Sequence, residues 1–187
     1  MDVMQAIKER RSVRRYRPDP VSDEALNAVL EAARWAPSWT NTQCWRFVVV
    51  REPETKQRLA AALKPLPSGG PNPAAPAFTS APVVIVSCAQ LGRSGFYRGE
   101  QSTARDDWFM FDVALAMQNL ALAAHSLGLG TVHVGLFDDK AVAEALDVPE
   151  GIAVVTLTPL GHPDETPKTP PRKELSDIVF REKYGAK

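Results

Sequence analysis

Five arginines lie within eight consecutive positions of the segment ERRSVRRYRP: Arg10, Arg11, Arg14, Arg15 and Arg17. Arg10, Arg11 and Arg14 are spaced i, i+1, i+4, so a helix that continued through them would place them on one side. The guanidinium fork matches the oxygens of a phosphate, and the hydroxyl of Ser12 adds a donor. The stretch therefore indicates a phosphate site, although a solvated basic face or a nucleic-acid-binding arm explains it equally well.

A second stretch, APSWTNTQCWRFVVV (residues 36–50), mixes hydrogen-bonding side chains with flat apolar ones. Ser38, Asn41 and Gln43 offer donors and acceptors, whereas Trp39 and Trp45 offer surfaces for stacking. This mixture fits a planar heteroaromatic ligand. An ordinary capped loop with one core tryptophan is an equally good interpretation of these residues alone.

The third stretch is GLGTVHVG (residues 128–135). It is not a dinucleotide-binding fingerprint, because the glycine spacing differs and the glycines precede a strand instead of following one. Gly128 and Gly130 are explained by a helix C-cap and a turn. Gly135 ends an apolar strand, where a missing side chain permits close approach of a ligand to the backbone.

The totals exclude several classes of protein. The 22 basic and 22 acidic residues give no net charge, which argues against the basic field of a nucleic-acid-binding domain. Two cysteines and three scattered histidines match no familiar zinc spacing, so no metal is expected. Residues 1–10 lack the apolar core of a signal peptide, so we expect a cytoplasmic protein with reduced thiols.

A length of 187 residues predicts one domain over residues 1–187. Apolar periodicity, capping residues and prolines predict helices over 2–9, 22–36, 53–63, 107–127 and 139–146, and strands over 45–51, 83–89, 128–135 and 152–161. Residues 65–82, with six prolines, are expected to form a long loop. Residues 162–187 read as a basic, proline-rich tail that is extended and then briefly helical. The expected fold class is α+β.

The helix expected over 107–127 is apolar nearly all round, since 14 of the 18 residues from Trp108 to His125 are apolar. Such a helix belongs in the core, at an oligomer interface, or both. Four polar residues, Asp112, Gln118, Asn119 and His125, interrupt the apolar run, which excludes a membrane span.

The ordered set of these stretches resembles the nitroreductase family of flavoproteins over nearly the whole chain. The resemblance rests on RRSVRRY, APSWTNTQCW, FDVALAMQNLALAAHSLGLGT, LTPLGHP and PPRKEL. It implies a mostly antiparallel central sheet flanked by helices, with the long helix at the interface of a homodimer. It further implies FMN bound at that interface and reduced by NADH or NADPH.

The resemblance also implies roles for single residues. Arg10, Arg11 and Ser12 would hold the FMN phosphate and ribityl chain together with Arg172, and Arg14 would reach the pyrimidine side of the flavin. Pro37, Ser38, Trp39 and Asn41 match the segment that the partner subunit lays against the flavin. His133, Val134 and Gly135 match the strand end along the isoalloxazine, with the Gly135 N–H as a donor to N5.

The sequence departs from the family pattern at two places. Larger relatives carry an asparagine and a lysine before the second strand, where this chain reads PNPAAPAFTSAP, with Asn72 and no lysine. Contact with the N1 and O2 edge of the flavin would therefore rest on Arg14. The proline that commonly follows the family's glutamine is replaced by Cys44, for which no nucleophilic role is expected.

The expected reaction is hydride transfer from NAD(P)H through the flavin to a planar acceptor, a nitroaromatic, quinone or enone, by a ping-pong mechanism. The flavin carries the chemistry, so no side chain is expected to be catalytic; Gly135 and Arg14 tune it. Residues 91–106, with Phe96 and Tyr97, are a candidate lid. Alternatives are a reductive dehalogenase or flavin-destroying relative of the same fold, and a flavin-binding protein without turnover.

Overall fold

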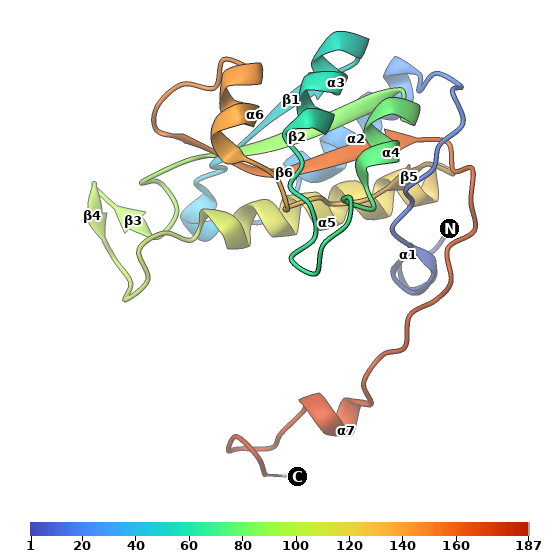
Figure 1. Cartoon of the computed structure of the whole chain (residues 1–187). Coiled ribbons are helices and arrows are strands. Elements are labelled where there is room, and N and C mark those ends of the chain that lie inside the picture. Colours follow the sequence, from blue (N-terminus) through green and yellow to red (C-terminus); the bar gives the residue numbers. More distant parts are fainter. Residues whose placement is uncertain (187) are drawn as a thin grey trace.

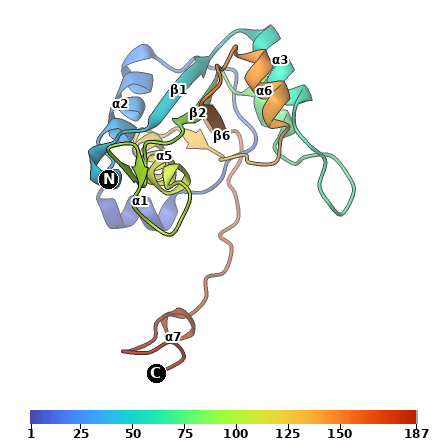
Figure 2. The same ribbon diagram turned by 90° about the vertical axis from the view of Figure 1, so that its left-hand side faces the viewer.

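The computed structural model describes residues 1–186, which form an antiparallel sheet between two layers of helices (Figures 1 and 2). The sheet has the order β1-β2-β6-β5, with β1 Trp45–Val50, β2 Val83–Gln90, β5 Gly130–Thr131 and β6 Ile152–Gly161. Every neighbouring pair is antiparallel. This confirms the predicted α+β class with a central antiparallel sheet.

Side chains of the central strand β2 alternate between the two helical layers, as the strand period of two requires. Val84, Val86 and Cys88 pack into the apolar cluster that contains Leu59 and Phe78. This cluster joins the sheet to α3 Pro53–Ala61, α4 Ala75–Ser80 and α6 Asp139–Ala145. Val83, Ile85 and Ala89 of β2 pack on the other face, against α2 Asp23–Arg34 and α5 Phe109–Ser126.

Helix α5 lies within two residues of its predicted bounds at each end and packs along α2 beneath the sheet (Figure 1). Its buried side chains include Val113, Ala116 and Leu120, which form the centre of the lower cluster. Near its N-terminal end, however, Met110 and Phe111 are each 56% exposed. No helix within residues 1–186 combines the length and apolarity needed to cross a membrane.

The predicted strand over 128–135 is wrong in length, because β5 pairs with β6 only through Gly130 and Thr131. Pairing resumes once, where Val134 and Leu157 exchange two backbone hydrogen bonds of 2.9 and 3.0 Å. On a strand, the backbone N–H and C=O groups of residues two apart point to the same side. Leu157 of β6 points these groups at Val134, so Pro159, two residues later, points its own toward Val132. Pro159 has no N–H to donate, which interrupts the ladder at this point.

One further prediction needs correction and one is confirmed. The segment 65–82 is not a loop throughout, because α4 forms within it with a proline in its first turn, a position that helices tolerate. Helix α1, Val3–Glu9, confirms the helix predicted over 2–9, and it ends before the arginines, because Arg10 is its C-cap, with φ −54° and ψ 131°. Arg10, Arg11 and Arg14 therefore do not share one side of a helix.

The two segments outside the layers are a hairpin and a tail. Residues 91–106 contain β3 Phe96–Tyr97 and β4 Glu100–Gln101, a short hairpin that projects from the body (Figure 1). The tail is extended from residue 162 onward and forms the short helix α7, Leu175–Ile178, away from the body (Figures 1 and 2). The extended, then briefly helical tail is as predicted.

Candidate functional site

A cavity of about 400 Å³ forms where the arginine-rich segment meets the tail. Its lining residues are Arg10, Arg11, Ser12, Arg14, Pro167, Lys168, Thr169, Pro170 and Arg172. Five of them carry a positive charge, and no acidic side chain among the described residues lines the cavity. The structure thus brings together four residues predicted for the phosphate and ribityl chain, Arg10, Arg11, Ser12 and Arg172, and the Arg14 predicted for the pyrimidine side.

The arginine-rich segment is held by backbone contacts to the sheet edge and by one buried tyrosine. Val13 N–H donates to Thr131 O at 3.0 Å, and Ser12 bridges to Thr131 in parallel orientation. The Tyr16 hydroxyl donates to Val13 O at 2.6 Å. Burial raises the pKa of Tyr16, so its hydroxyl keeps the proton that this hydrogen bond needs.

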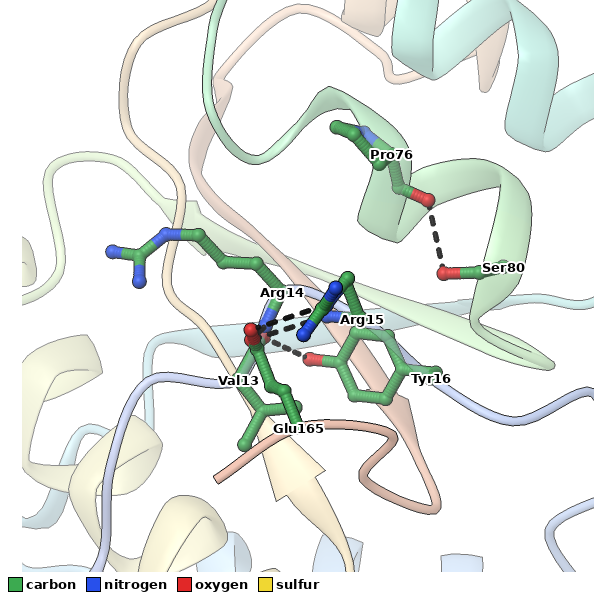
Figure 3. A network of polar contacts seen from close by, with 7 residues as sticks. All are labelled: Val13, Arg14, Arg15, Tyr16, Pro76, Ser80 and Glu165. Atoms are coloured by element: carbon green, nitrogen blue, oxygen red, sulfur yellow. Dashed lines mark hydrogen bonds and ion pairs between the residues drawn. The ribbon is translucent and has the colours of Figure 1, made fainter. Parts of the chain in front are cut away.

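Glu165 fastens the same segment from the tail side (Figure 3). One of its carboxylate oxygens accepts the backbone N–H groups of Arg14 and Arg15, at 2.5 and 3.3 Å. The other pairs with the Arg15 guanidinium at 3.4 Å. Glu165 therefore fixes the backbone at Arg14 and leaves the Arg14 guanidinium free to line the cavity.

The tail closes the cavity through Arg11. The guanidinium of Arg11 donates to Thr169 Oγ1 at 2.9 and 3.3 Å, and to the carbonyls of Lys8 and Arg10 at 2.6 and 2.8 Å. Partial burial, followed by the charges of Arg11 and Arg172, lowers the pKa of Arg10. Like charges this close repel one another, so the cavity favours an anion that neutralises them.

Sequence reasoning missed Lys168, Thr169 and Glu165. The only local signal was the basic and hydroxyl residues beside Pro170 in HPDETPKTPPRK. Their partners lie about 150 positions earlier in the chain, and no spacing rule connects segments so far apart.

His133, Val134 and Gly135 lie where the chain leaves β5. His133 Nδ1 is 3.0 Å from Thr158 Oγ1, and partial burial, followed by the charge of Arg10, lowers the pKa of His133 to about 4. The imidazole is therefore neutral at pH 7. A Cβ built on Gly135 would have no heavy atom within 4 Å.

Two neighbouring glycines differ from Gly135. A Cβ on Gly130 would lie 2.8 Å from the Val13 side chain, and one on Gly161 would lie 2.6 Å from Pro82. Packing within the chain therefore requires glycine at those two positions. It does not require glycine at Gly135, which leaves open space beside an exposed backbone.

The segment 37–41 lines a different cavity. Pro37, Ser38 and Trp39 face Trp108, Phe111, Asp112 and Leu115 across about 370 Å³. Asn41 lies beside this cavity in sequence and accepts a hydrogen bond from Gln43 Nε2 at 3.1 Å. Within one subunit, the structure does not bring these predicted residues to the arginine-lined cavity.

The backbone of this segment is strained. Thr40, Asn41 and Gln43 have φ angles of 43°, 58° and 47°, in the left-handed region that side chains other than glycine rarely adopt. Asparagine tolerates this region, but a β-branched threonine does not. Such strain is kept where the surroundings over-determine the backbone, which is common at binding sites.

Cys44 is a buried thiol behind this cavity, and its Sγ lies 3.7 Å from Asp112 Oδ2. Burial, followed by the nearby Asp112 carboxylate, raises the pKa of Cys44 to about 12. At pH 8 only about one thiol in ten thousand is then ionised, and the thiolate is the reactive form.

We therefore expect iodoacetamide at pH 8 to leave Cys44 unmodified in the folded protein and to alkylate it in guanidinium chloride, as measured by mass spectrometry. Cys88, buried in β2 with its pKa raised to about 11, is the internal control and should behave the same way. Rapid labelling of Cys44 alone would show that the loop in front of it opens.

A cavity of about 830 Å³ lies elsewhere, between α2 and β1; it is lined by Trp45, the second stacking candidate, but by none of the residues that the family resemblance assigns to the flavin. We therefore locate the candidate site by the charge of the arginine-lined cavity, the open space at Gly135 and the aromatic side chains beside segment 37–41. Cavity volume is not used to locate it.

Comparisons with known proteins identify the family and the fold. The model of the Nitroreductase family matches residues 7–162. An NADH dehydrogenase of Thermus thermophilus is 33% identical over 205 residues, covering 96% of each chain. Two solved structures are similar: the NADPH:FMN oxidoreductase of Vibrio harveyi complexed with NAD+ (28% identity, TM-score 0.81, 97% of this chain and 77% of that one) and an FMN-dependent nitroreductase of Clostridium difficile (26%, 0.78, 96% and 99%). Since the family model spans the whole four-stranded sheet, the long helix and the arginine-rich segment, this chain belongs to the nitroreductase family.

Proposed function

We propose that this protein is an FMN-dependent oxidoreductase that takes hydride from NADH or NADPH and passes it to a planar acceptor. The observation that carries the proposal is the cavity of five cations built from residues 10–14 and 167–172. A relative from Bacillus subtilis, 26% identical over 98% of this chain, is named FMN reductase. This name and those of the similar structures support FMN and NAD(P)H as the cofactor and the reductant.

The residues present fit FMN. Arg10, Arg11 and Arg172 supply guanidinium groups for the phosphate, and Ser12 adds a hydroxyl. The open space at Gly135 admits a flat ring next to the backbone, where the Gly135 N–H is the proposed donor to N5. Arg14 supplies positive charge for the pyrimidine side.

When bound, FMN supplies the hydride chemistry, and the protein supplies its placement and electrostatics. The neutral His133 adds no second charge beside the ring. We propose that reductant and acceptor use one slot in turn, which gives ping-pong kinetics. Flat aromatic walls favour planar acceptors such as nitroaromatics, quinones and enones.

A homodimer completes the site in this proposal. Segment 37–41 and the arginines line separate cavities within one chain, so a second copy must supply one of them if both contact the same flavin. Val3, Met4 and Ile7 on α1 are 69%, 58% and 47% exposed, and Met110 and Phe111 on α5 are exposed as well. Exposed apolar residues on two helices that contact each other are typical of a subunit interface.

The visible spectrum of the purified protein, before and after NADH or NADPH is added without oxygen, tests the proposal. We expect flavin bands that bleach on addition of the reductant and return with a quinone. Bands that persist would indicate a flavin-binding protein without turnover. A colourless protein that cannot be loaded with FMN would overturn the proposal. It would favour the alternative that the arginine-rich segment binds nucleic acid.

A further inference from the structure

Asp112 is a buried carboxylate at the start of α5 to which the proposed chemistry gives no role. Its exposed fraction is 0%, and no lysine or arginine in residues 1–186 forms an ion pair with it. Instead it accepts hydrogen bonds from Trp39 N–H at 3.0 Å, the Ser94 hydroxyl at 2.7 Å, the Thr42 hydroxyl at 3.3 Å and the Cys44 thiol at 3.7 Å. A charge buried without a cation depends on such donors for its stability.

These donors come from two segments that are otherwise far apart in the sequence. Trp39, Thr42 and Cys44 belong to the strained loop, and Ser94 belongs to the start of the 91–106 hairpin. Ser94 is fully buried, and its hydrogen bond is the shortest of the four. One carboxylate therefore holds the loop and the hairpin at the same point.

The aromatic cavity of about 370 Å³ lies between the loop and the start of α5, with Trp39 on one wall and Trp108 on the other. The hairpin fixes Trp108: Gly95 lies so close that a Cβ there would be 2.7 Å from the indole, and the Trp108 Nε1–H donates to Thr103 Oγ1 at 2.9 Å. Phe111 packs edge-on against Trp108, with 5.7 Å between ring centroids. A shift of the hairpin would therefore move this wall.

We propose that Asp112 is a positioning residue that fixes both walls of the aromatic cavity and so determines which planar acceptors the enzyme binds. The inference deepens the proposed function and rests on it for the identity of the ligand. The hydrogen bond from Ser94 ties the hairpin to Asp112, and the hydrogen bond from Trp39 N–H ties the loop to it. Neither Asp112 nor Ser94 is expected to contact the reacting atoms.

The test compares Ser94→Ala with Ser87→Ala. Both serines are fully buried and both donate one hydrogen bond, but Ser87 donates to Thr156 O within the sheet, at 3.3 Å. We expect Ser94→Ala to increase deuterium uptake in residues 91–107 and 38–44 and to raise the KM for a planar quinone about fivefold, with kcat changed less than about twofold. The matched control should change neither the KM nor the uptake of these two segments.

Substitutions of Asp112 itself should give a graded result. Asparagine can still accept from Trp39 N–H and donate to the two hydroxyls, whereas alanine can do neither. We expect deuterium uptake of both segments to increase in the order wild type, Asp112→Asn, Asp112→Ala. Asp112→Ala leaves buried donors unpaired and is the variant most at risk of misfolding, so Ser94→Ala decides the case.

The exchange measurement needs no turnover, which separates this inference from the proposed function. If the protein neither binds FMN nor oxidises NAD(P)H but Ser94→Ala still loosens both segments, the proposed function fails and the positioning role of Asp112 stands. Unchanged uptake in Ser94→Ala, or a KM equal to that of Ser87→Ala, would overturn the inference.

Discussion

We expect the substitution of Arg10 by alanine to raise the dissociation constant for FMN about 100-fold, because charge-assisted hydrogen bonds to a phosphate contribute about 2–3 kcal/mol. Arg10 is a half-buried member of the cationic cavity and has Arg11 and Arg172 as charged neighbours. Its removal also relieves their repulsion, so the free protein should not lose stability. Titration of the cofactor-free protein with FMN, followed by quenching of flavin fluorescence, measures the change.

Arg17→Ala is the matched control for this experiment. Arg17 belongs to the same basic stretch but pairs with Asp19 at 3.1 Å and does not line the cavity. We expect its FMN affinity to stay within about twofold of the wild type, since exposed ion pairs contribute little. Equal affinities in both variants would mean that the phosphate lies elsewhere. Loss of nucleic-acid binding in Arg10→Ala, with flavin affinity intact, would support the alternative that the arginine-rich segment is a nucleic-acid-binding arm.

Gly135→Val should abolish FMN binding while leaving the cofactor-free protein folded. The open space around Gly135 accepts a side chain at no steric cost within the chain. The same side chain would occupy the volume proposed for the flavin ring. We expect at least about a 100-fold loss of FMN affinity, as for a blocked apolar pocket, and a change in Tm below about 2 °C.

Gly130→Ala serves as the reverse control. Its Cβ would lie 2.8 Å from Val13, so the alanine should lower the Tm measurably through overpacking. A Gly135→Val protein that binds FMN as the wild type does would contradict the placement of the ring at this strand end. Melting curves of both variants without FMN show whether the two glycines differ as expected.

The order and type of most elements could be predicted because local signals determine them. The Ser22 side chain accepts from Ala25 N–H at the start of α2, as an N-cap does, and β2 carries the apolar run of a fully buried strand. The early end of β5 could not be predicted, because its cause is Pro159 on another strand. Likewise, α4 is six residues long and begins among prolines, where helix signals are weak.

In the candidate site, too, features set by local sequence could be predicted, and features set by contacts between distant segments could not. That Arg10 and Arg172 share one site was predicted only through a family resemblance, since nothing in the spacing of either segment requires them to meet. The role of Asp112 was not predicted at all, because an isolated carboxylate in an apolar helix signals only an interruption. Its four donors, three from one loop and one from another, become visible only when the chain is folded.

The cationic cavity joins residues that lie 158 positions apart, as the Arg11 to Thr169 hydrogen bond shows. During synthesis, the first half of this cavity exists long before the second half has been made. The sheet and α5 can pack in the meantime, since they need nothing beyond residue 161. If this cavity holds the proposed FMN phosphate, the cofactor can bind only late in the life of each chain, after the second half of the cavity has been made.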